Sequence, residues 1–448
     1  MMSRGLQDVR YLKRQFFRTL RRRQNPEGTE VMEEIKRRVQ RTFLDFGKLC
    51  IWVILGLFLG LITALFEFIY AKGLDLVLDL HARFNPWILI GMPAAGLFIV
   101  WLFEKYGRLS KRGMNLVFEI SQGQERWIPK RTLSLMMIST WLSNLFGASV
   151  GRESVAMQIG TALASLVNRH IRGLKHARTI FLVTGMAAGF AGLFGTPYTA
   201  VFFALEVLVA GTLKFRALPS TIAAALMASW TAGQLGIHAE IHPLAELASI
   251  SSIQEGWRFL LLGIIFGLVG GGFAWCSKKF RKWIARRIPD AKKRVLIMGS
   301  IFAMLLFVLY SGRYSNYGTN LIEACFANPA GQIYPWDWLL KMMLSIGCLS
   351  IGFVGGEVTP LFAVGASLGF VIGPLFGVDP VWAAALGYAA VFGAGTNTWL
   401  APIMVGIEIF GFAGFPAFFI CCSAAYLLNH SESIYALQQR YDEMDEEA

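Results

Sequence analysis

The residues best suited to chemistry lie in a short charged stretch, Gly151-Arg152-Glu153-Ser154, that interrupts two apolar segments. An arginine and a glutamate at membrane depth are costly unless they line a water-filled cavity or an ion path, so Glu153 is our candidate for the centre of a mechanism. The structural alternative is that Glu153 caps a helix that begins after Gly151, because the helix dipole favours a carboxylate in the first turn. A second interruption about 200 residues later, Gly355 to Pro360, favours the functional interpretation.

Three glycine-bearing stretches open apolar segments and could offer donors to an anion: Gly113-Met114-Asn115, Gly151-Arg152-Glu153-Ser154 and Gly355-Gly356-Glu357-Val358-Thr359-Pro360. A helix N-terminus presents backbone N–H groups without partners, backed by a positive dipole, and these replace part of an anion's water shell. Glu153 at such a helix start could occupy the place of the anion with its own carboxylate and leave it on protonation. This exchange would couple anion movement to proton movement.

The other acidic and hydroxyl side chains allow both functional and structural interpretations. A carboxylate such as Glu357 repels a neighbouring anion unless it is protonated or hydrogen-bonded, and a protonated Glu357 could donate a hydrogen bond. Thr359 adds a hydroxyl donor, or it satisfies the helix end. For Glu206 and Glu408, which end apolar runs in equivalent places, we favour a structural role in which each carboxylate satisfies a neighbouring helix end.

Composition places the chain in a membrane. Of its 448 residues 55% are hydrophobic and 16% are charged, and the mean hydropathy is +0.51. These values predict an all-α polytopic membrane protein. The net charge of +13 comes from basic residues outside the apolar segments, in the first 48 residues and in Lys278 to Arg294. Such clustering indicates the positive-inside bias and contact with anionic lipid, so we expect no nucleic-acid partner.

Metal and cofactor chemistry has little support in the sequence. The six cysteines form no CxxC pair and no disulfide framework. His238, Glu240 and His242 stand close together in a short polar connection, where facing water is the simpler expectation than holding a metal. We therefore expect neither a metal site nor a cofactor.

Recurring motifs divide the membrane part into two halves. Leu55-Gly56, Gly151 with Glu153, and Gly185 with Glu206 recur in the same order and at nearly the same shift, as Leu262-Gly263, Gly355 with Glu357, and Gly387 with Glu408. We expect a basic cytoplasmic segment at 1–48, membrane repeats at 49–245 and 255–430, and a C-terminal helix with a short acidic cytoplasmic tail at 431–448. The first membrane helix is expected at about 49–70 and the second at about 87–103. Because both basic stretches should be cytoplasmic, the repeats are inverted.

At these residues the sequence resembles the CLC family of anion channels and proton-coupled anion antiporters. Gly151-Arg152-Glu153 with Gln158 is similar to the family's GREG-type motif, Gly185 to Glu206 to its GxxAG…P…E segment, and Gly355 to Gly369 to its GxFxP…G stretch. The resemblance covers nearly everything from Leu49 to about Arg440. It implies the CLC fold of tilted and broken helices, a homodimer with one ion path per subunit, and Glu153 as the gating glutamate at the outer side.

Three departures from chloride-handling relatives resemble the CLC-F branch of fluoride/proton antiporters. Met114 replaces a central serine, Val207 replaces an inner proton-handling glutamate, and the GxFxP stretch reads Gly-Glu-Val-Thr-Pro. From periodicity alone Tyr435 is an interface tyrosine, but the resemblance places it near the central anion site. It also makes Glu357 a polar or proton site beside the route. The anion-binding residues that the resemblance implies are Met114, Asn115, Phe118, Val358, Thr359 and Tyr435.

The sequence therefore predicts an antiporter of the bacterial inner membrane, with both termini cytoplasmic, that expels fluoride in exchange for protons. Its partners would be the transported fluoride and protons, the lipid bilayer and a second copy of the chain. A chloride/proton exchanger or chloride channel of the same fold is the alternative, and Met114, Glu357 and Thr359 argue against it. A membrane-embedded enzyme with Glu153 and Glu357 as acid and base is a third interpretation, against which the lack of metal-ligand clusters and of a sizeable soluble domain argues.

Overall fold

The computed structural model describes residues 26–171, 176–238, 241–244, 256–327, 331–429 and 432–441, with side chains from residue 46 onward. It divides into two units, Met1–Val53 and Ile54–Ala448. The part of the basic segment before Pro26, the acidic tail after residue 441 and Glu240 lie outside the described residues. The account below concerns the second unit, apart from the bounds of the first helix.

The first described helix, α2 (Pro26–Phe84), is much longer than the span expected at about 49–70. It continues past Tyr70 because no helix breaker occurs before Asn85-Pro86. From Ile54 onward one face is buried and the opposite face exposes large apolar side chains, as a helix between protein and lipid should.

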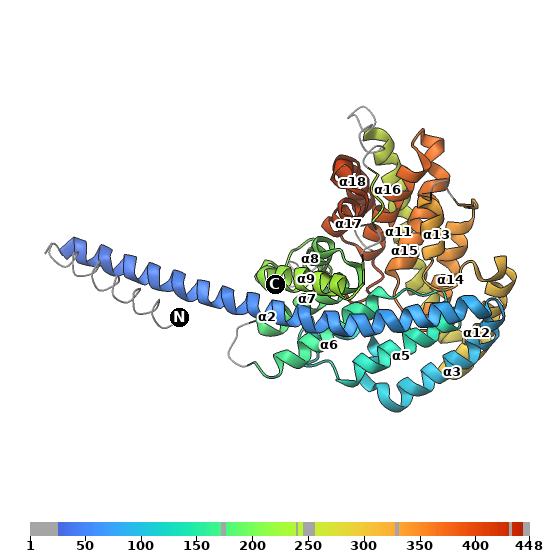
Figure 1. Cartoon of the computed structure of the whole chain (residues 1–448), viewed down its shortest axis with the longest axis horizontal. Coiled ribbons are helices and arrows are strands. Elements are labelled where there is room, and N and C mark those ends of the chain that lie inside the picture. The colour runs from blue at the N-terminus through green and yellow to red at the C-terminus, as the bar shows by residue number, and fades with distance from the viewer. Residues whose placement is uncertain are drawn as a thin grey trace. The chain divides into compact units, whose positions relative to one another are not determined.

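The remaining elements are mostly short helices separated by glycine and proline (Figure 1). Those up to residue 234 are η1 (Trp87–Gly91), α3 (Met92–Leu102), η2 (Phe103–Gly107), η3 (Arg108–Arg112), α4 (Met114–Ser121), α5 (Arg131–Leu145), α6 (Glu153–Asn168), α7 (Ala177–Phe194), α8 (Pro197–Glu206), β1 (Val209–Ala210), η4 (Phe215–Ala217) and α9 (Leu218–Gln234). The later ones are α11 (Gly256–Arg287), α12 (Ala291–Val308), η6 (Tyr310–Gly312), α13 (Thr319–Phe326), α14 (Asp337–Ile351), α15 (Val358–Ile372), η7 (Gly373–Phe376), α16 (Pro380–Thr396), α17 (Leu400–Phe410), η8 (Phe412–Gly414), α18 (Phe415–Leu428) and β2 (Gln439–Arg440).

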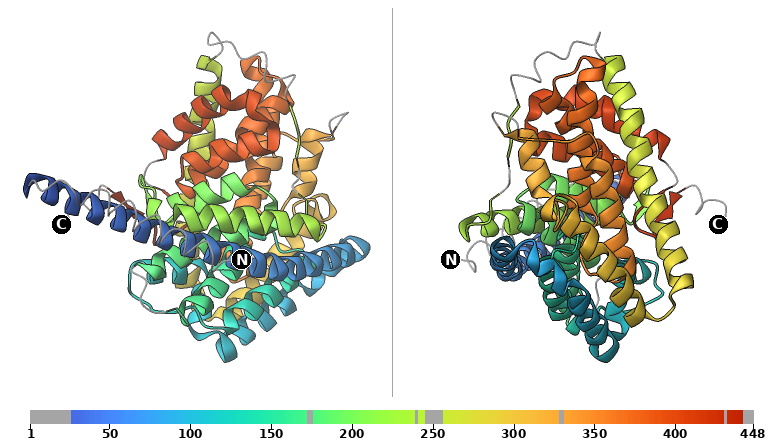
Figure 2. Two further views of the ribbon diagram at one scale, coloured as in Figure 1. Left: turned by 60° about the vertical axis from the view of Figure 1, so that its left-hand side comes forward. Right: turned by 90° about the vertical axis from the view of Figure 1, so that its right-hand side faces the viewer.

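Several of these helices suit a bilayer. Among the described residues, 5 helical segments are long and apolar enough to cross a membrane. The longest after α2 is α11, which packs alongside α14, α16 and α18 (Figure 2). At its basic end the chain turns into α12, where Asp290 accepts hydrogen bonds from the backbone N–H groups of Lys293 and Lys292, and these bonds lower the pKa of the Asp290 carboxyl. The segments that meet the length criterion are Phe46–Phe84, Trp87–Ser121, Ala177–Phe194, Gly256–Arg287 and Val358–Phe376.

Two pairs of helices cross at glycines in equivalent places of the two expected halves. Gly160 of α6 lies against the backbone of Gly185 in α7, and Gly365 of α15 lies against the backbone of Gly387 in α16. In both pairs a Cβ on either glycine would collide with the backbone of the other helix. Small residues allow membrane helices to approach this closely, and the two pairs are among the most extensive helix contacts of the fold.

The carboxylates of Glu206 and Glu408 cap each other's helices. Glu206, the last residue of α8, accepts hydrogen bonds from the backbone N–H groups of Trp399, Leu400 and Ala401 at the start of α17, at 2.5, 3.1 and 3.3 Å. Glu408 of α17 in turn accepts bonds at the start of α8, from the backbone N–H groups of Tyr198 at 2.9 Å and Thr199 at 2.7 Å. These contacts confirm the structural role that the sequence predicted for both glutamates.

The C-terminal stretch corrects one expectation. A helix was expected from residue 431, but within 432–440 the chain forms turns and the short strand β2, which pairs in parallel with β1. The reason is that several polar groups of this stretch bond to distant helix ends. Ile434 N–H donates to the Gly395 carbonyl at 2.9 Å, and Gln438 Nε2 donates to the Val207 and Thr396 carbonyls at 3.0 and 3.1 Å.

The glycine crossing of α15 and α16 gives a stability prediction. Gly365→Ala should destabilise the protein by about 1 to 3 kcal/mol, because the methyl group has no room against the Gly387 backbone. Thermal unfolding in detergent, followed by loss of the monodisperse peak in size-exclusion chromatography, measures the change. Gly272→Ala is the matched control, since Gly272 lies inside α11 with no atom within 4 Å of an added Cβ. An equal loss in both variants would contradict the packing argument.

Candidate functional site

The site is built where α6 and α15 begin side by side. Gly151 and Gly356 exchange two backbone hydrogen bonds, N–H to carbonyl at 2.7 Å in one direction and 2.8 Å in the other, and so form an isolated antiparallel bridge. Glycine is needed for this approach, since a Cβ on Gly355 would lie 2.5 Å from the side chain of Val150. The bridge therefore fixes two helix N-termini, and the two charged interruptions of the sequence, at one place.

Glu153, the first residue of α6, is folded back over this bridge. Its side chain is 0% exposed, and a Cβ added to Gly356 would lie 2.5 Å from Glu153 Oε2. Backbone N–H groups of Glu153, Arg152 and Thr359 lie near the carboxylate. Neither carboxylate oxygen, however, has a hydrogen-bond partner of ordinary geometry among the described residues. A buried carboxylate in this condition is costly and can be displaced easily.

Glu357, the N-cap of α15, lies between a buried hydroxyl and an exposed guanidinium. Ser154 Oγ donates to Glu357 Oε2 at 3.5 Å, and Arg281 Nη2 of α11 lies 3.5 Å from Glu357 Oε1. The side chains of Glu357 and Arg281 are 14% and 46% exposed. Glu357 therefore contacts the protein interior at Ser154 and the partly exposed surface at Arg281.

Two buried hydroxyl groups near these helix starts have no hydrogen-bond partner among the described residues, Thr359 Oγ1 and the Tyr435 hydroxyl. Tyr435 is 4% exposed, so the interface position expected from periodicity alone is wrong. Its hydroxyl lies near Ser154, and its ring packs 5.4 Å from the ring of Phe118, centroid to centroid. Val358, between the two polar residues of α15, is 0% exposed.

The third glycine-bearing stretch begins α4 beside the second turn of α6. Gly113 is its N-cap in a positive-φ conformation. Gln158 Oε1 of α6 lies 3.8 Å from the position of a Cβ on Gly113 and has no hydrogen-bond partner in the described part of the chain. Met114 is 9% exposed and Asn115 is half-buried. The structure thus brings together Met114, Phe118, Glu153, Glu357, Val358, Thr359 and Tyr435 on α4, α6, the start of α15 and the C-terminal stretch, with Asn115 next in the chain.

Two buried ionisable residues near the site were not singled out by the sequence. Lys341 of α14 is 0% exposed and donates to Ser149 Oγ at 2.8 Å and to the Asn316 carbonyl at 2.6 Å. Ser149 belongs to the segment that leads into α6, so Lys341 anchors that segment. Glu67 of α2 is also 0% exposed. Both are charged residues that interrupt apolar runs, and that signal could have identified them.

The site offers hydrogen-bond donors and two carboxyl groups. Backbone N–H groups at helix starts and two hydroxyl groups are hydrogen-bond donors, and the carboxyl groups of Glu153 and Glu357 are chemically able to bind and release a proton. Within the described residues no group of three or more histidine, cysteine, aspartate or glutamate side chains could hold a metal ion. His238 and His242 are described and Glu240 is not, and no function is assigned to them.

Comparison with known proteins agrees with this arrangement. The family model described as voltage gated chloride channel matches residues 95–430. A chloride/fluoride channel protein of Pseudomonas syringae pv. tomato is 34% identical over 364 residues, which are 79% of each chain. The crystal structure of a CLC-type fluoride/proton antiporter is 43% identical, with a TM-score of 0.85, and the match covers 88% of this chain and 99% of that one.

A more distant structure shares the fold alone. The slow cyanobacterial Cl−/H+ antiporter is 19% identical, with a TM-score of 0.74, and the match covers 84% of this chain and 94% of that one. The expected fold class, a polytopic helical membrane protein with broken helices, is confirmed by the two structures together. The chain belongs to the voltage gated chloride channel family, the CLC family.

Proposed function

We propose that the protein exports fluoride across the membrane in exchange for protons. The observation that carries the proposal is the buried Glu153 carboxylate, without hydrogen-bond partners of ordinary geometry among the described residues, at the joined starts of α6 and α15. The similarity to a CLC-type fluoride/proton antiporter at 43% identity supports fluoride as the anion. A small, strongly hydrated anion needs many donors, and the site supplies both helix N-termini and free hydroxyl groups.

The anion route runs past the hydroxyl groups. Thr359 and Tyr435 donate hydrogen bonds to fluoride, Val358 contributes its backbone N–H group, and the ring of Phe118 presents its edge. Met114 and Asn115 form the inner end of the route at the start of α4. Met114 has no hydroxyl group with which to donate a hydrogen bond. A larger and less strongly hydrated anion such as chloride is therefore stabilised little at the inner end of the route.

The proton route depends on two glutamates. Glu153 leaves the helix starts when it is protonated and returns as a carboxylate, and fluoride takes its place in between. Glu357 receives a proton within the protein, where the Ser154 hydroxyl is 3.5 Å away. Arg281, 3.5 Å from the other oxygen of Glu357, favours the ionised form of Glu357, which then releases its proton toward the protein surface.

The arrangement in the membrane follows the sequence argument. We place inverted repeats at 49–245 and 255–430, a basic cytoplasmic segment at 1–48, and the C-terminal stretch on the cytoplasmic side. The matching glycine crossings and the mutual caps of Glu206 and Glu408 support two related halves. The protein acts in the bacterial inner membrane as a homodimer with one ion path in each subunit.

Anion flux separates this function from chloride exchange within the same fold. Proteoliposomes loaded with equal fluoride and chloride should release fluoride, read with ion-selective electrodes, while an internal pH dye reports proton entry. We expect chloride release to be at least about tenfold slower than fluoride release. The site offers many hydrogen-bond donors, which favour fluoride, whereas fewer and weaker donors suit chloride. Comparable release of both anions would indicate a chloride/proton exchanger or channel instead.

Substitution of the gating glutamate tests coupling. Glu153→Gln should abolish proton-driven fluoride export, because a neutral amide cannot alternate between a charged and an uncharged form. The measurement is fluoride efflux against proton uptake in the same vesicles. Glu104→Gln, which removes an exposed carboxylate paired with Lys292 at 2.7 Å, is the control and should transport normally. Full coupled transport by Glu153→Gln would remove this residue from the mechanism.

A second pair of variants separates a transport role from a structural one. Glu357→Gln should lower fluoride turnover by about tenfold or more. A positioned group that transfers a proton usually contributes at least that much to the rate. Glu206→Gln keeps an oxygen that accepts bonds from the start of α17, and should transport at the normal rate with a lower unfolding temperature. If both variants lost activity equally and in step with stability, Glu357 would be a structural residue.

A further inference from the structure

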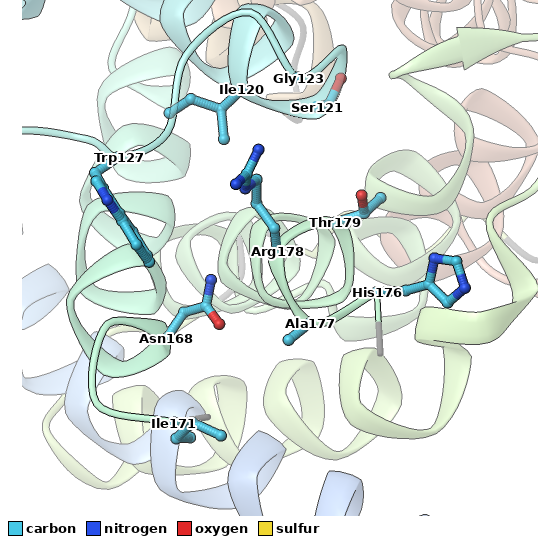
Figure 3. A pocket seen from close by; sticks show the side chains of 10 residues that line it. All are labelled: Ile120, Ser121, Gly123, Trp127, Asn168, Ile171, His176, Ala177, Arg178 and Thr179. Atoms are coloured by element: carbon cyan, nitrogen blue, oxygen red, sulfur yellow. The ribbon is translucent and has the colours of Figure 1, made fainter. Parts of the chain in front are cut away.

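A second site lies outside the anion route, where the ends of α4 and α6 meet the start of α7. Here the structure has an open pocket of about 400 Å3 whose lining includes Ser121, Trp127, Asn168, Arg178 and Thr179 (Figure 3). None of the residues assigned to fluoride or to protons lines it. The volume lies within the range of about 300 to 1,000 Å3 that small-molecule sites occupy in proteins.

Arg178 stands at the unfavourable end of its helix. It is the second residue of α7, an 18-residue helix without an acidic residue in its first turn. The helix dipole is positive at this end, so a guanidinium there is repelled unless an anion lies between them. No hydrogen bond or ion pair joins Arg178 to another residue in the described part of the chain, and Figure 3 shows its guanidinium projecting into the pocket.

Asn168 gives an independent sign of a missing ligand. It is the last residue of α6 and only 8% exposed. Its side-chain amide has no hydrogen-bond partner among the residues that the structure describes, and Figure 3 shows the amide turned toward Arg178 across the pocket. Because Asn168 lines the open pocket, a ligand there can accept hydrogen bonds from its amide.

The surroundings of the pocket are basic. The guanidinium of Arg169 lies over the ring of Trp127, 5.4 Å from its centroid, and Arg169 Nη2 donates to the Ile128 carbonyl at 2.8 Å. On the other side Arg216 Nη1 lies 2.9 Å from Nε2 of His176, the N-cap of α7. The local field therefore attracts an anion.

Acidic side chains close by are already neutralised. Glu119 and Glu125, which lie on and after α4, both pair with Arg112, at 2.6 and 3.3 Å. No acidic residue is among those that line the pocket. None of the acidic residues that the structure describes therefore pairs with Arg178.

We propose that this pocket binds a phosphate group, carried either by an anionic lipid or by a small soluble phosphate. The Arg178 guanidinium holds two phosphate oxygens, since its planar fork matches their geometry. The Asn168 amide and the first-turn N–H groups of α7 donate further hydrogen bonds to the phosphate oxygens, each of which can accept more than one. The bound charge offsets the repulsion between Arg178 and the helix dipole, so the ligand stabilises the start of α7.

Binding by the full chain in neutral detergent tests the proposal. Native mass spectrometry with added phosphatidylglycerol or phosphatidylcholine, and calorimetric titration with inorganic phosphate, measure the two sources. We expect binding of phosphatidylglycerol, of inorganic phosphate, or of both, and weakening by roughly tenfold or more in Arg178→Gln, because the charged hydrogen bonds are lost. Phosphatidylglycerol alone would identify a lipid headgroup, and inorganic phosphate alone would identify a soluble ligand.

Two further variants make the result specific. Arg131→Gln removes the same charge from an exposed residue at the start of α5 that does not line the pocket, and should bind normally. Asn168→Leu keeps the shape of the side chain without its amide and should also weaken binding. In phosphate-free buffer Arg178→Gln should unfold at the same temperature as the original chain or higher. The proposal is overturned if no phosphate compound binds, or if Arg131→Gln and Arg178→Gln weaken binding equally.

Discussion

A carboxylate held inside a membrane protein without hydrogen bonds is among the most expensive groups that a fold can contain. The structure holds Glu153 in this condition by a single backbone feature, the pair of hydrogen bonds between Gly151 and Gly356. That bridge brings the starts of α6 and α15 together, and their N–H groups and dipoles provide the field in which a carboxylate or a small anion is tolerated. The other parts of the site, Glu357 with Ser154 and the hydroxyls of Thr359 and Tyr435, are arranged around it.

Because the donors are mostly backbone groups, the side chains near the bridge are free to set selectivity and proton transfer. Thr359 and Tyr435 add hydroxyl groups, and Glu357 adds a second carboxyl group. Glycines maintain the arrangement, since Oε2 of Glu153 occupies the space that a Cβ at Gly356 would need. In this chain, then, glycine at the bridge is required by the neighbouring glutamate as much as by the close approach of the two backbones.

Much of this could be predicted from the sequence, for identifiable reasons. A charge between apolar runs located Glu153 and Glu357, and glycine before each run predicted a helix start, which the structure confirms at residues 153 and 358. The structural role of Glu206 and Glu408 was also predicted correctly. Tyr435 was placed near the site only by family resemblance, because its burial depends on contacts with residues hundreds of positions away. Arg281 could not be singled out from the sequence, because it lies in a basic run that membrane orientation already explains.

The mutual caps of Glu206 and Glu408 have a consequence for how the protein is made. The start of α8 is satisfied only by a carboxylate that lies about 200 residues further along the chain, and so is synthesised much later. Until then the N–H groups of Tyr198 and Thr199 remain uncapped, which hydrocarbon tolerates poorly. The first half of the chain therefore completes its structure only after the second half has entered the bilayer, and biogenesis must keep α8 in a polar or protein-lined environment during that interval.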